Sequence, residues 1–337
     1  MSEPSSSQQA SPGGALRLSY RRENQRQAQL VISAEQSNSI LPSQCETPFS
    51  ARRIAVLDSA PCRLGEGAGY DPNTDTAWWF DLLCPVLHER SIQTGVSRTI
   101  RMPGRASLLV PTDGAHPLVA MDDGLHVWDR GEDRFHPYLT LNAGASAKMR
   151  THCGRVHPSG SLWIASMHHD AAHGCGMIHV VRNGQAQLLF DRLTVPSSIC
   201  FSPDGTAGYF ADTPDGVIYR VALDPQSGLP IGLPQVFFDG SHRPGGIDGS
   251  VVDRGGTLWN VRWGTASLDA YEPNGRWQKT ITLPAAQPTS LVFIGGNAEN
   301  LLITSAAVGL PCNEVDGRAM IVRSLFRGCV DAAFRLT

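Results

Sequence analysis

The chain has 337 residues, of which 18% are charged, and its formal net charge is -3. This balance, without any run of lysine or arginine, excludes a polyanion-binding protein, so no nucleic-acid partner is expected. The longest apolar stretches are strand-sized, and the N-terminus lacks the charged-then-apolar pattern of a secretory signal, so we expect no membrane contact and a cytoplasmic location. Eight cysteines are scattered without a C-x-x-C pair, which favours reduced thiols over a disulfide framework or a zinc knuckle.

The N-terminal segment differs in composition from the rest of the chain. Residues 1–50 contain eleven serines and seven glutamines and show no sustained helical or strand periodicity. Such a segment is typical of a mobile extension. From Arg53 onward, short β-rich runs alternate with Gly, Pro, Asp and Asn. We therefore predict a mobile extension over 1–50 and one folded domain over 51–337.

A turn followed by an apolar strand occurs six times in the folded domain. The six strands are predicted at 77–81, 117–121, 162–166, 207–211, 258–261 and 301–304. The turns before them end at residues 73, 114, 160, 205, 256 and 296, so the repeat length lies between 40 and 51 residues. A period in the forties with several strands per period is typical of a propeller, with one sheet per blade. The sequence therefore predicts an all-β fold, a six-bladed β-propeller.

Polar side chains recur at one position of the repeat. Counting back eight residues from the third, fourth and fifth turns reaches His152, Ser197 and Asp248, and counting seven from the first turn reaches Glu66. The innermost strands of a propeller line one channel, so these four side chains are predicted to face one another. Burying them together is costly unless a divalent cation satisfies them. The alternative, which applies above all to Ser197, is a polar residue at a strand start bonding to nearby backbone.

Four segments carry a resemblance to a known family. Segment 62–67 (CRLGEG) is similar to the L-G-E-G motif of the regucalcin, gluconolactonase and luciferin-regenerating enzyme family, and segment 248–259 (DGSVVDRGGTLW) resembles its D-G-x-x-x-D-x-x-G-x-L-W motif. Segments 197–202 (SSICFS) and 150–155 (RTHCGR) are similar to its N-G-L-x-x-S and R-x-N-D-G-[KR] motifs in part. The resemblance extends from about residue 55 to about residue 334.

The resemblance implies a metal site and a reaction. Members of the family have six-bladed propellers, bind one divalent metal in the channel through a Glu, an Asn and an Asp, and typically open sugar lactones. By position, Glu66 and Asp248 match the acidic ligands, and Ser197 replaces the ligand Asn. His152 replaces a second Asn, which holds substrate or water, and Arg150 matches an arginine that contacts substrate.

The departures from the family pattern affect the expected metal. His152 offers a nitrogen donor, so Zn²⁺ or Mn²⁺ is favoured, with Ca²⁺ as the alternative. Two histidines, His168 and His169, follow the third predicted strand, and adjacent strand residues point to opposite faces. At most one of them therefore faces the site, and we take His168 as a candidate substrate-binding residue.

Together these features predict a divalent-metal-dependent hydrolase that opens a sugar lactone or a similar small cyclic ester with an activated water. Asp248 is expected to be a metal ligand and the general base, and Glu66 and Ser197 to be ligands only. His152 is expected to ligate the metal or orient water, and Arg150 to bind substrate or the developing oxyanion. A hydrolase of a non-sugar substrate and a non-catalytic binding propeller remain the alternatives. The expected partner is a small molecule, and the sequence does not predict the oligomeric state.

Overall fold

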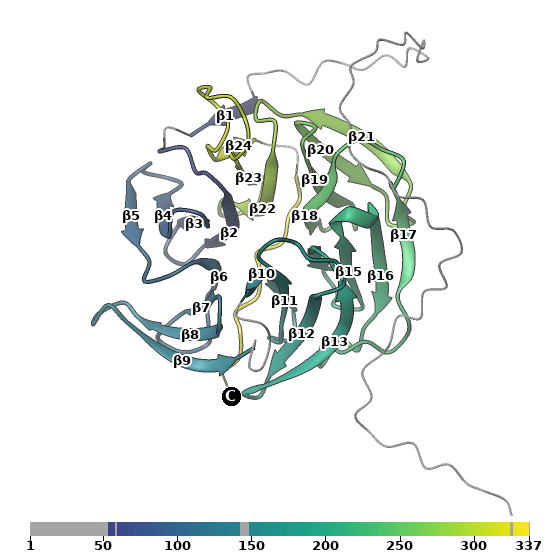
Figure 1. Cartoon of the computed structure of the whole chain (residues 1–337), viewed down its shortest axis with the longest axis horizontal. Helices are drawn as coiled ribbons and strands as arrows, with labels where there is room; N and C mark the ends of the chain where they lie inside the picture. Colours follow the sequence, from purple (N-terminus) through teal and green to yellow (C-terminus); the bar gives the residue numbers. More distant parts are fainter. Residues whose placement is uncertain (1–52, 58, 142–147, 324–325, 337) are drawn as a thin grey trace, which may run out of the picture.

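The computed structural model describes residues 53–57, 59–141, 148–323 and 326–336, and the predicted extension over 1–50 lies outside them. The described residues form six four-stranded antiparallel sheets arranged around a central axis, which confirms the predicted six-bladed propeller (Figure 1). A 3₁₀ turn at Thr213–Asp215 accompanies the strands. Within this part of the chain, no helix is long and apolar enough to cross a membrane.

The first three blades follow one another along the chain, and each runs from the channel outward in sequence order. Blade 1 consists of β2 (Gly65–Asp71), β3 (Thr76–Asp81), β4 (Val86–Ser91) and β5 (Ser97–Arg101). Blade 2 consists of β6 (Ala106–Val110), β7 (Leu118–Met121), β8 (Gly124–Asp129) and β9 (Arg134–Thr140). Blade 3 consists of β10 (Met149–Val156), β11 (Leu162–His168), β12 (Gly176–Arg182) and β13 (Gln185–Leu193).

The last three blades include the one that closes the ring. Blade 4 consists of β14 (Pro196–Phe201), β15 (Ala207–Asp212), β16 (Val217–Ala222) and β17 (Gln235–Asp239). Blade 5 consists of β18 (Gly246–Val252), β19 (Leu258–Trp263), β20 (Ser267–Tyr271) and β21 (Trp277–Thr282). Blade 6 consists of β22 (Pro288–Ile294), β23 (Asn300–Ser305), β24 (Met320–Val322) and β1 (Ile54–Val56). Because β1 pairs with β24, the start and the end of the propeller share one sheet.

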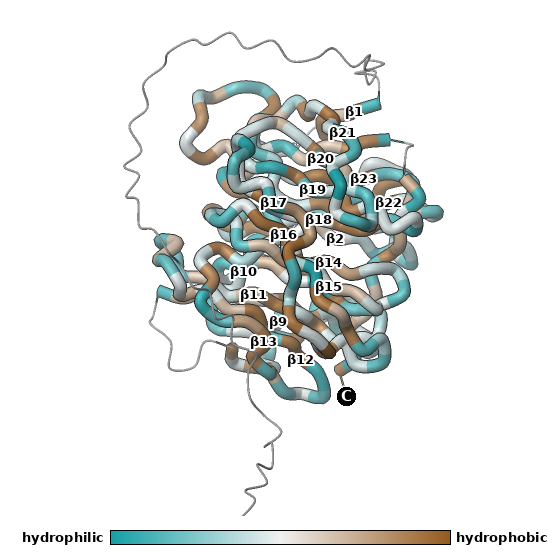
Figure 2. The backbone as a smooth tube through the Cα atoms, turned by 90° about the vertical axis from the view of Figure 1, so that its right-hand side faces the viewer, coloured by the Kyte–Doolittle hydropathy of each residue, from teal (hydrophilic) through white to brown (hydrophobic). Residues whose placement is uncertain are grey.

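The hydrophobic core is divided among the six gaps between neighbouring blades. Each of the six clusters of buried apolar side chains joins two adjacent sheets, for example Trp163 and Phe190 of blade 3 with Phe210 of blade 4. Both faces of a middle strand are therefore covered, and its sequence is nearly continuously apolar. This explains why the six predicted strands, all of which are the second strands of their blades, stand out in the sequence. In the side view, apolar stretches follow the strands and hydrophilic residues gather at the turns (Figure 2).

Residues 326–336 form a segment that we call the C-terminal strap. In Figure 1 it is the yellow segment crossing the centre of the ring. Its backbone bonds to the turns that follow the innermost strands of four blades, through Arg254 in blade 5, Ala298 in blade 6, Asp113 in blade 2 and Gly160 in blade 3. The strap thus connects opposite sides of the propeller.

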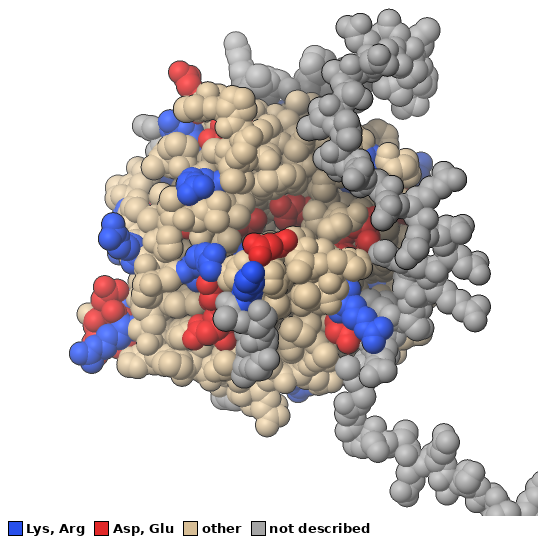
Figure 3. Space-filling view, viewed as in Figure 1, with Lys and Arg blue, Asp and Glu red and all other residues tan. Residues whose placement is uncertain are grey.

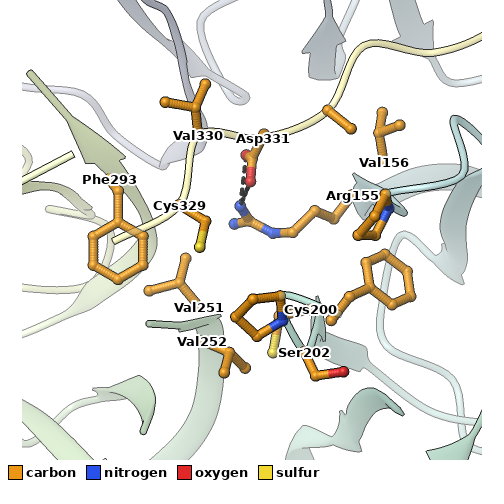
Figure 4. A pocket seen from close by; sticks show the side chains of 14 residues that line it. Arg155, Val156, Cys200, Ser202, Val251, Val252, Phe293, Cys329, Val330 and Asp331 are labelled. Atoms are coloured by element: carbon orange, nitrogen blue, oxygen red, sulfur yellow. Dashed lines mark hydrogen bonds and ion pairs between the residues drawn. The ribbon is translucent and has the colours of Figure 1, made fainter. Parts of the chain in front are cut away.

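Arg155 of β10 joins the strap to the channel. Its Nη1 lies 2.6 Å from both carboxylate oxygens of Asp331 in the strap (Figure 4). Its Nη2 donates to the carbonyl of Leu291 at 3.1 Å. Arg155 also lines a cavity of about 240 Å³ under the strap and a smaller cavity inside the channel. Its side chain therefore separates the channel from the cavity under the strap.

Candidate active site

All six innermost strands break their pairing register, and every break begins in the first half of its strand. The breaks lie between Glu66 and Gly69, Ala106 and Leu108, Thr151 and Gly154, Ser197 and Cys200, Ile247 and Ser250, and Pro288 and Leu291. A bulge leaves residues unpaired and turns their side chains away from the regular pleat. Each blade therefore has an irregular point at the same level of the channel, where its side chains can be redirected.

The residues found by counting back from the turns lie at these irregular points. Glu66 and Ser197 are the last paired residues before their breaks. His152 and Asp248 lie inside their breaks, one position further along. The count therefore finds the correct level in each blade, but the four residues occupy two different positions of the bulge.

Two carboxylates, Glu66 and Asp248, meet inside the channel. Glu66 is buried and Asp248 is half-buried. Burial raises the pKa of Glu66 from 4.5 to about 7, against the opposing effect of the Arg150 cation. Burial, and then the nearby charge of Glu66, raise the pKa of Asp248 well above its ordinary value. At neutral pH and without a bound cation, the pair of carboxyl groups therefore retains protons that isolated carboxyl groups would release.

Such a pair fits a divalent cation, because one ion with two positive charges would offset both carboxylate charges and supply the missing solvation. Both donors are oxygen atoms, which suits hard cations. Within the described ranges, however, no group of three or more His, Cys, Asp and Glu side chains is close enough to hold a metal ion. Among the acidic side chains that the structure describes, those available to a cation in the channel are the two carboxylates, Glu66 and Asp248.

The hydroxyl of Ser197 is engaged between blades 4 and 5. Ser197 is fully buried, donates a hydrogen bond to the carbonyl of Ile247 at 3.0 Å, and accepts one from the hydroxyl of Thr213 at 2.9 Å. Both contacts tie β14 to its neighbours. The Ser197 hydroxyl thus bonds to nearby backbone, as expected if Ser197 is a polar residue at a strand start rather than a metal ligand.

Arg150 and His152 form a buried pair on β10. Nη1 of Arg150 lies 3.3 Å from Nδ1 of His152 and 3.1 Å from the carbonyl oxygen of Thr151. Burial, and then the Arg150 cation, lower the pKa of His152 to about 3. The other ring nitrogen of His152, Nε2, is buried and has no hydrogen-bond partner among the described residues. His152 is therefore a neutral imidazole with one nitrogen occupied and one unpaired.

The two histidines after β11 have different neighbours. Nδ1 of His168 accepts a hydrogen bond from the backbone of Asp170 at 3.1 Å. Nε2 of His169 lies 3.0 Å from a guanidinium nitrogen of Arg105. Burial, and then the charges of Arg105 and Arg150, lower the pKa of His169. These contacts place His169 in the charged group near Arg150, whereas His168 bonds within its own loop.

Asn260 of β19 is a site residue that the sequence analysis did not identify. It is fully buried, and its Nδ2 lies 2.9 Å from the carbonyl oxygen of Asp248 and 3.0 Å from that of Gly249. The amide therefore fixes the backbone of the bulge that carries Asp248. The available signal was an asparagine in the middle of an otherwise apolar strand, since a buried amide requires partners.

A cavity of about 30 Å³ lies beside the carboxylates. Two carboxylates and several hydroxyl groups line it, those of Glu66, Asp248, Ser107, Ser198, Ser250, Thr289 and Ser290. Two larger cavities, of about 240 and 340 Å³, are not lined by the predicted site residues. The space-filling view shows the face of the ring hollowed near its centre, with acidic side chains inside the hollow (Figure 3). The carboxylates therefore occupy a narrow, polar channel.

Comparison with known proteins gives consistent results. Residues 64–307 match the model of the SMP-30/gluconolactonase/LRE-like region. A protein of Rhizobium meliloti (strain 1021) named "Putative sugar lactone lactonase" is 39% identical over 294 residues, which are 86% of this chain and 98% of the relative. The 6-deoxy-6-sulfogluconolactonase of Pseudomonas putida is 26% identical over 281 residues, 81% of this chain and 96% of the relative. The structure of regucalcin, a calcium-binding protein from Agrobacterium tumefaciens str. C58, has a TM-score of 0.81 at 38% identity and covers 83% of this chain and 96% of its own.

Proposed function

The chain belongs to the SMP-30/gluconolactonase/LRE-like family, and from this membership we propose that it hydrolyses a sugar lactone with the help of one divalent cation. The observation that carries the proposal is the pair of carboxylates, Glu66 and Asp248, at the bulges of two innermost strands. Lactone hydrolysis is further supported by the lactonase names of two relatives.

We propose that Glu66 and Asp248 hold the cation. When bound, a divalent cation supplies a Lewis acid for the lactone carbonyl and lowers the pKa of water. Because both donors are oxygen atoms, a hard cation such as Mn²⁺ or Ca²⁺ fits them better than Zn²⁺. The preference for Zn²⁺ predicted from sequence depends on a nitrogen donor from His152, and one nitrogen of that ring already faces Arg150.

Asp248 is the proposed general base. Its carboxylate accepts a proton from the attacking water, and the water oxygen forms a bond to the carbonyl carbon of the lactone. The bond between that carbon and the ring oxygen then breaks, and the ring oxygen takes up the proton, so that the product is the open-chain hydroxy acid. Asn260 keeps the Asp248 backbone in position during these steps.

A lactone panel combined with metal analysis tests the proposed function. Purified protein is depleted with a chelator, reloaded with Mn²⁺, Ca²⁺ or Zn²⁺, and assayed with five- and six-membered sugar lactones against their spontaneous hydrolysis. Ring opening that depends on the added cation is the expected result. Metal-free protein that binds these lactones without opening them would instead support the non-catalytic binding propeller.

The raised pKa of Glu66 predicts a pH-dependent stability in chelator. Between about pH 4.5 and 7 the folded protein keeps the proton of Glu66 while the unfolded chain releases it, so the free energy of unfolding falls as the pH rises. Glu66→Gln has no carboxyl group to deprotonate, so its free energy of unfolding should not fall in this way. At pH 8 it is expected to exceed that of the unaltered protein by up to about 3 kcal/mol, with a smaller difference at pH 5. Urea unfolding at both pH values measures it.

The exposed Glu314 provides the matched control, and Glu314→Gln should follow the unaltered protein at both pH values. If the free energies of unfolding of Glu66→Gln and of the unaltered protein differ by the same amount at pH 5 and pH 8, the assignment of a raised pKa to Glu66 is wrong.

A further inference from the structure

The contact between Arg150 and His152 restricts where the imidazole proton can be. A guanidinium group carries N–H donors and no acceptor. The nitrogen of His152 that lies 3.3 Å from Nη1 of Arg150 is Nδ1, so Nδ1 must be the acceptor. In a neutral imidazole the proton is then on Nε2.

We propose that Arg150 is a positioning residue that fixes His152 as the neutral Nε2–H tautomer, which makes His152 a hydrogen-bond donor and neither a base nor a metal ligand. In this tautomer Nε2 has no free electron pair for a proton or a cation. The tautomer itself does not depend on the proposed lactone hydrolysis. Only the identity of the oxygen that accepts a hydrogen bond from Nε2 rests on that proposed function.

The unpaired state of Nε2 points to the acceptor. A buried N–H without a partner costs about 1–3 kcal/mol, and such groups are rare in folded proteins. Nε2 of His152 is buried without a partner among the residues that the structure describes. A carbonyl oxygen of bound lactone would satisfy it, and the bond would strengthen as charge develops on that oxygen. A neutral imidazole can act as such a donor.

Two of the five N–H donors of Arg150, those on Nη1, are committed to this task. Nη1 has two hydrogens, and its two contacts are Nδ1 of His152 and the carbonyl oxygen of Thr151. Both contacts lie within β10, so this end of the guanidinium holds the local geometry of the strand. Through Nη1, Arg150 therefore acts on His152, and this contribution differs from a direct contact between Nη1 and substrate.

Nitrogen NMR of histidine-labelled protein tests the tautomer without substrate. The ring signals of His152 are assigned by their loss in His152→Gln. The expected spectrum has a protonated Nε2 and an unprotonated Nδ1 between about pH 5 and 8. Arg150→Met should give a mixture of both tautomers, whereas Arg150→Lys, which keeps a donor, should preserve the Nε2–H form. A proton on Nδ1 in the unaltered protein, or an unchanged spectrum in Arg150→Met, would overturn the inference.

A double-mutant cycle tests the coupling on a hydrolysed lactone. His152→Leu is expected to lower kcat by about 10²–10³-fold, as for loss of one oxyanion donor, and His152→Gln should lower it less because its amide can donate. Adding Arg150→Met to His152→Leu should cause little further loss. Additive losses would mean that Arg150 acts independently of His152, either on substrate or through its charge on Glu66. Loss of bound Mn²⁺ in His152→Gln would make His152 a ligand, and either result would overturn the inference.

If no lactone is hydrolysed, the proposed function fails, while the NMR spectra still decide the tautomer.

Discussion

Replacing Asp248 with asparagine is expected to lower the turnover of a sugar lactone by about 10²–10⁴-fold, the usual contribution of a general base. The amide has the same shape and keeps an oxygen donor, but it cannot accept a proton from water. The propeller should remain folded, because Asn260 holds this segment through the backbone carbonyl groups of Asp248 and Gly249, and neither bond involves the Asp248 carboxylate. Steady-state kinetics at saturating cation, with circular dichroism as the folding check, measures the effect.

The matched variant for this comparison is Glu66→Gln. Glu66 is proposed to hold the cation without exchanging protons, so its loss should weaken cation affinity, and excess cation should restore part of the activity. Excess cation should not restore Asp248→Asn. Equal rescue of the two variants would remove the distinction between base and ligand, and a fully active Asp248→Asn enzyme would exclude Asp248 from the mechanism.

Truncation of Phe334 in the C-terminal strap is expected to lower the free energy of unfolding by about 3–5 kcal/mol, the range for a fully buried Phe changed to Ala. Phe334 is completely buried in the cluster between blades 2 and 3 and packs edge-to-face against Tyr138 at a centroid distance of 6.0 Å. Its backbone also bonds to Pro111 and Asp113 of blade 2. Urea unfolding of Phe334→Ala measures the loss.

The neighbouring Ala333 is exposed and supplies the control, since Ala333→Ser changes a strap residue without opening a cavity. The carboxylates lie in the first half of the innermost strands, whereas the strap bonds to the turns that follow these strands. Phe334→Ala protein that is still folded at low temperature should therefore keep its kcat. A stability equal to that of Ala333→Ser would mean that the strap contributes little to the fold.

The blades could be predicted from sequence because each needs a tight turn before a strand that is covered on both faces. The carboxylates Glu66 and Asp248 could be found by counting from these turns, since every innermost strand bulges at the same level. The count could not distinguish the two positions of the bulge, and therefore it treated Ser197 as equivalent to His152. Whether Ser197 bonds to a neighbouring strand depends on packing between blades, which no periodicity reveals.

Other features depend on contacts between distant segments. The proton position on His152 follows from the placement of one guanidinium nitrogen, and a motif of residue types does not contain this information. The strap bonds to four blades mainly through its backbone, so its sequence carries no signal apart from Phe334. Arg155 looks in the sequence like part of the segment 150–155, yet it pairs with Asp331, 176 residues further along.

The shared sheet of blade 6 has a consequence for biosynthesis. Among the strands that the structure describes, this blade combines β1, which comes first in the chain, with β22, β23 and β24, the last three. Until those strands are made, the face of blade 1 that carries Trp79 has no partner, because its cluster is completed by Leu302 and Ile321. Exposed apolar surface on an unfinished chain promotes aggregation. The nascent protein therefore carries this surface through most of translation, and chaperones that shield apolar segments should matter more for its yield than for proteins whose first sheet is complete early.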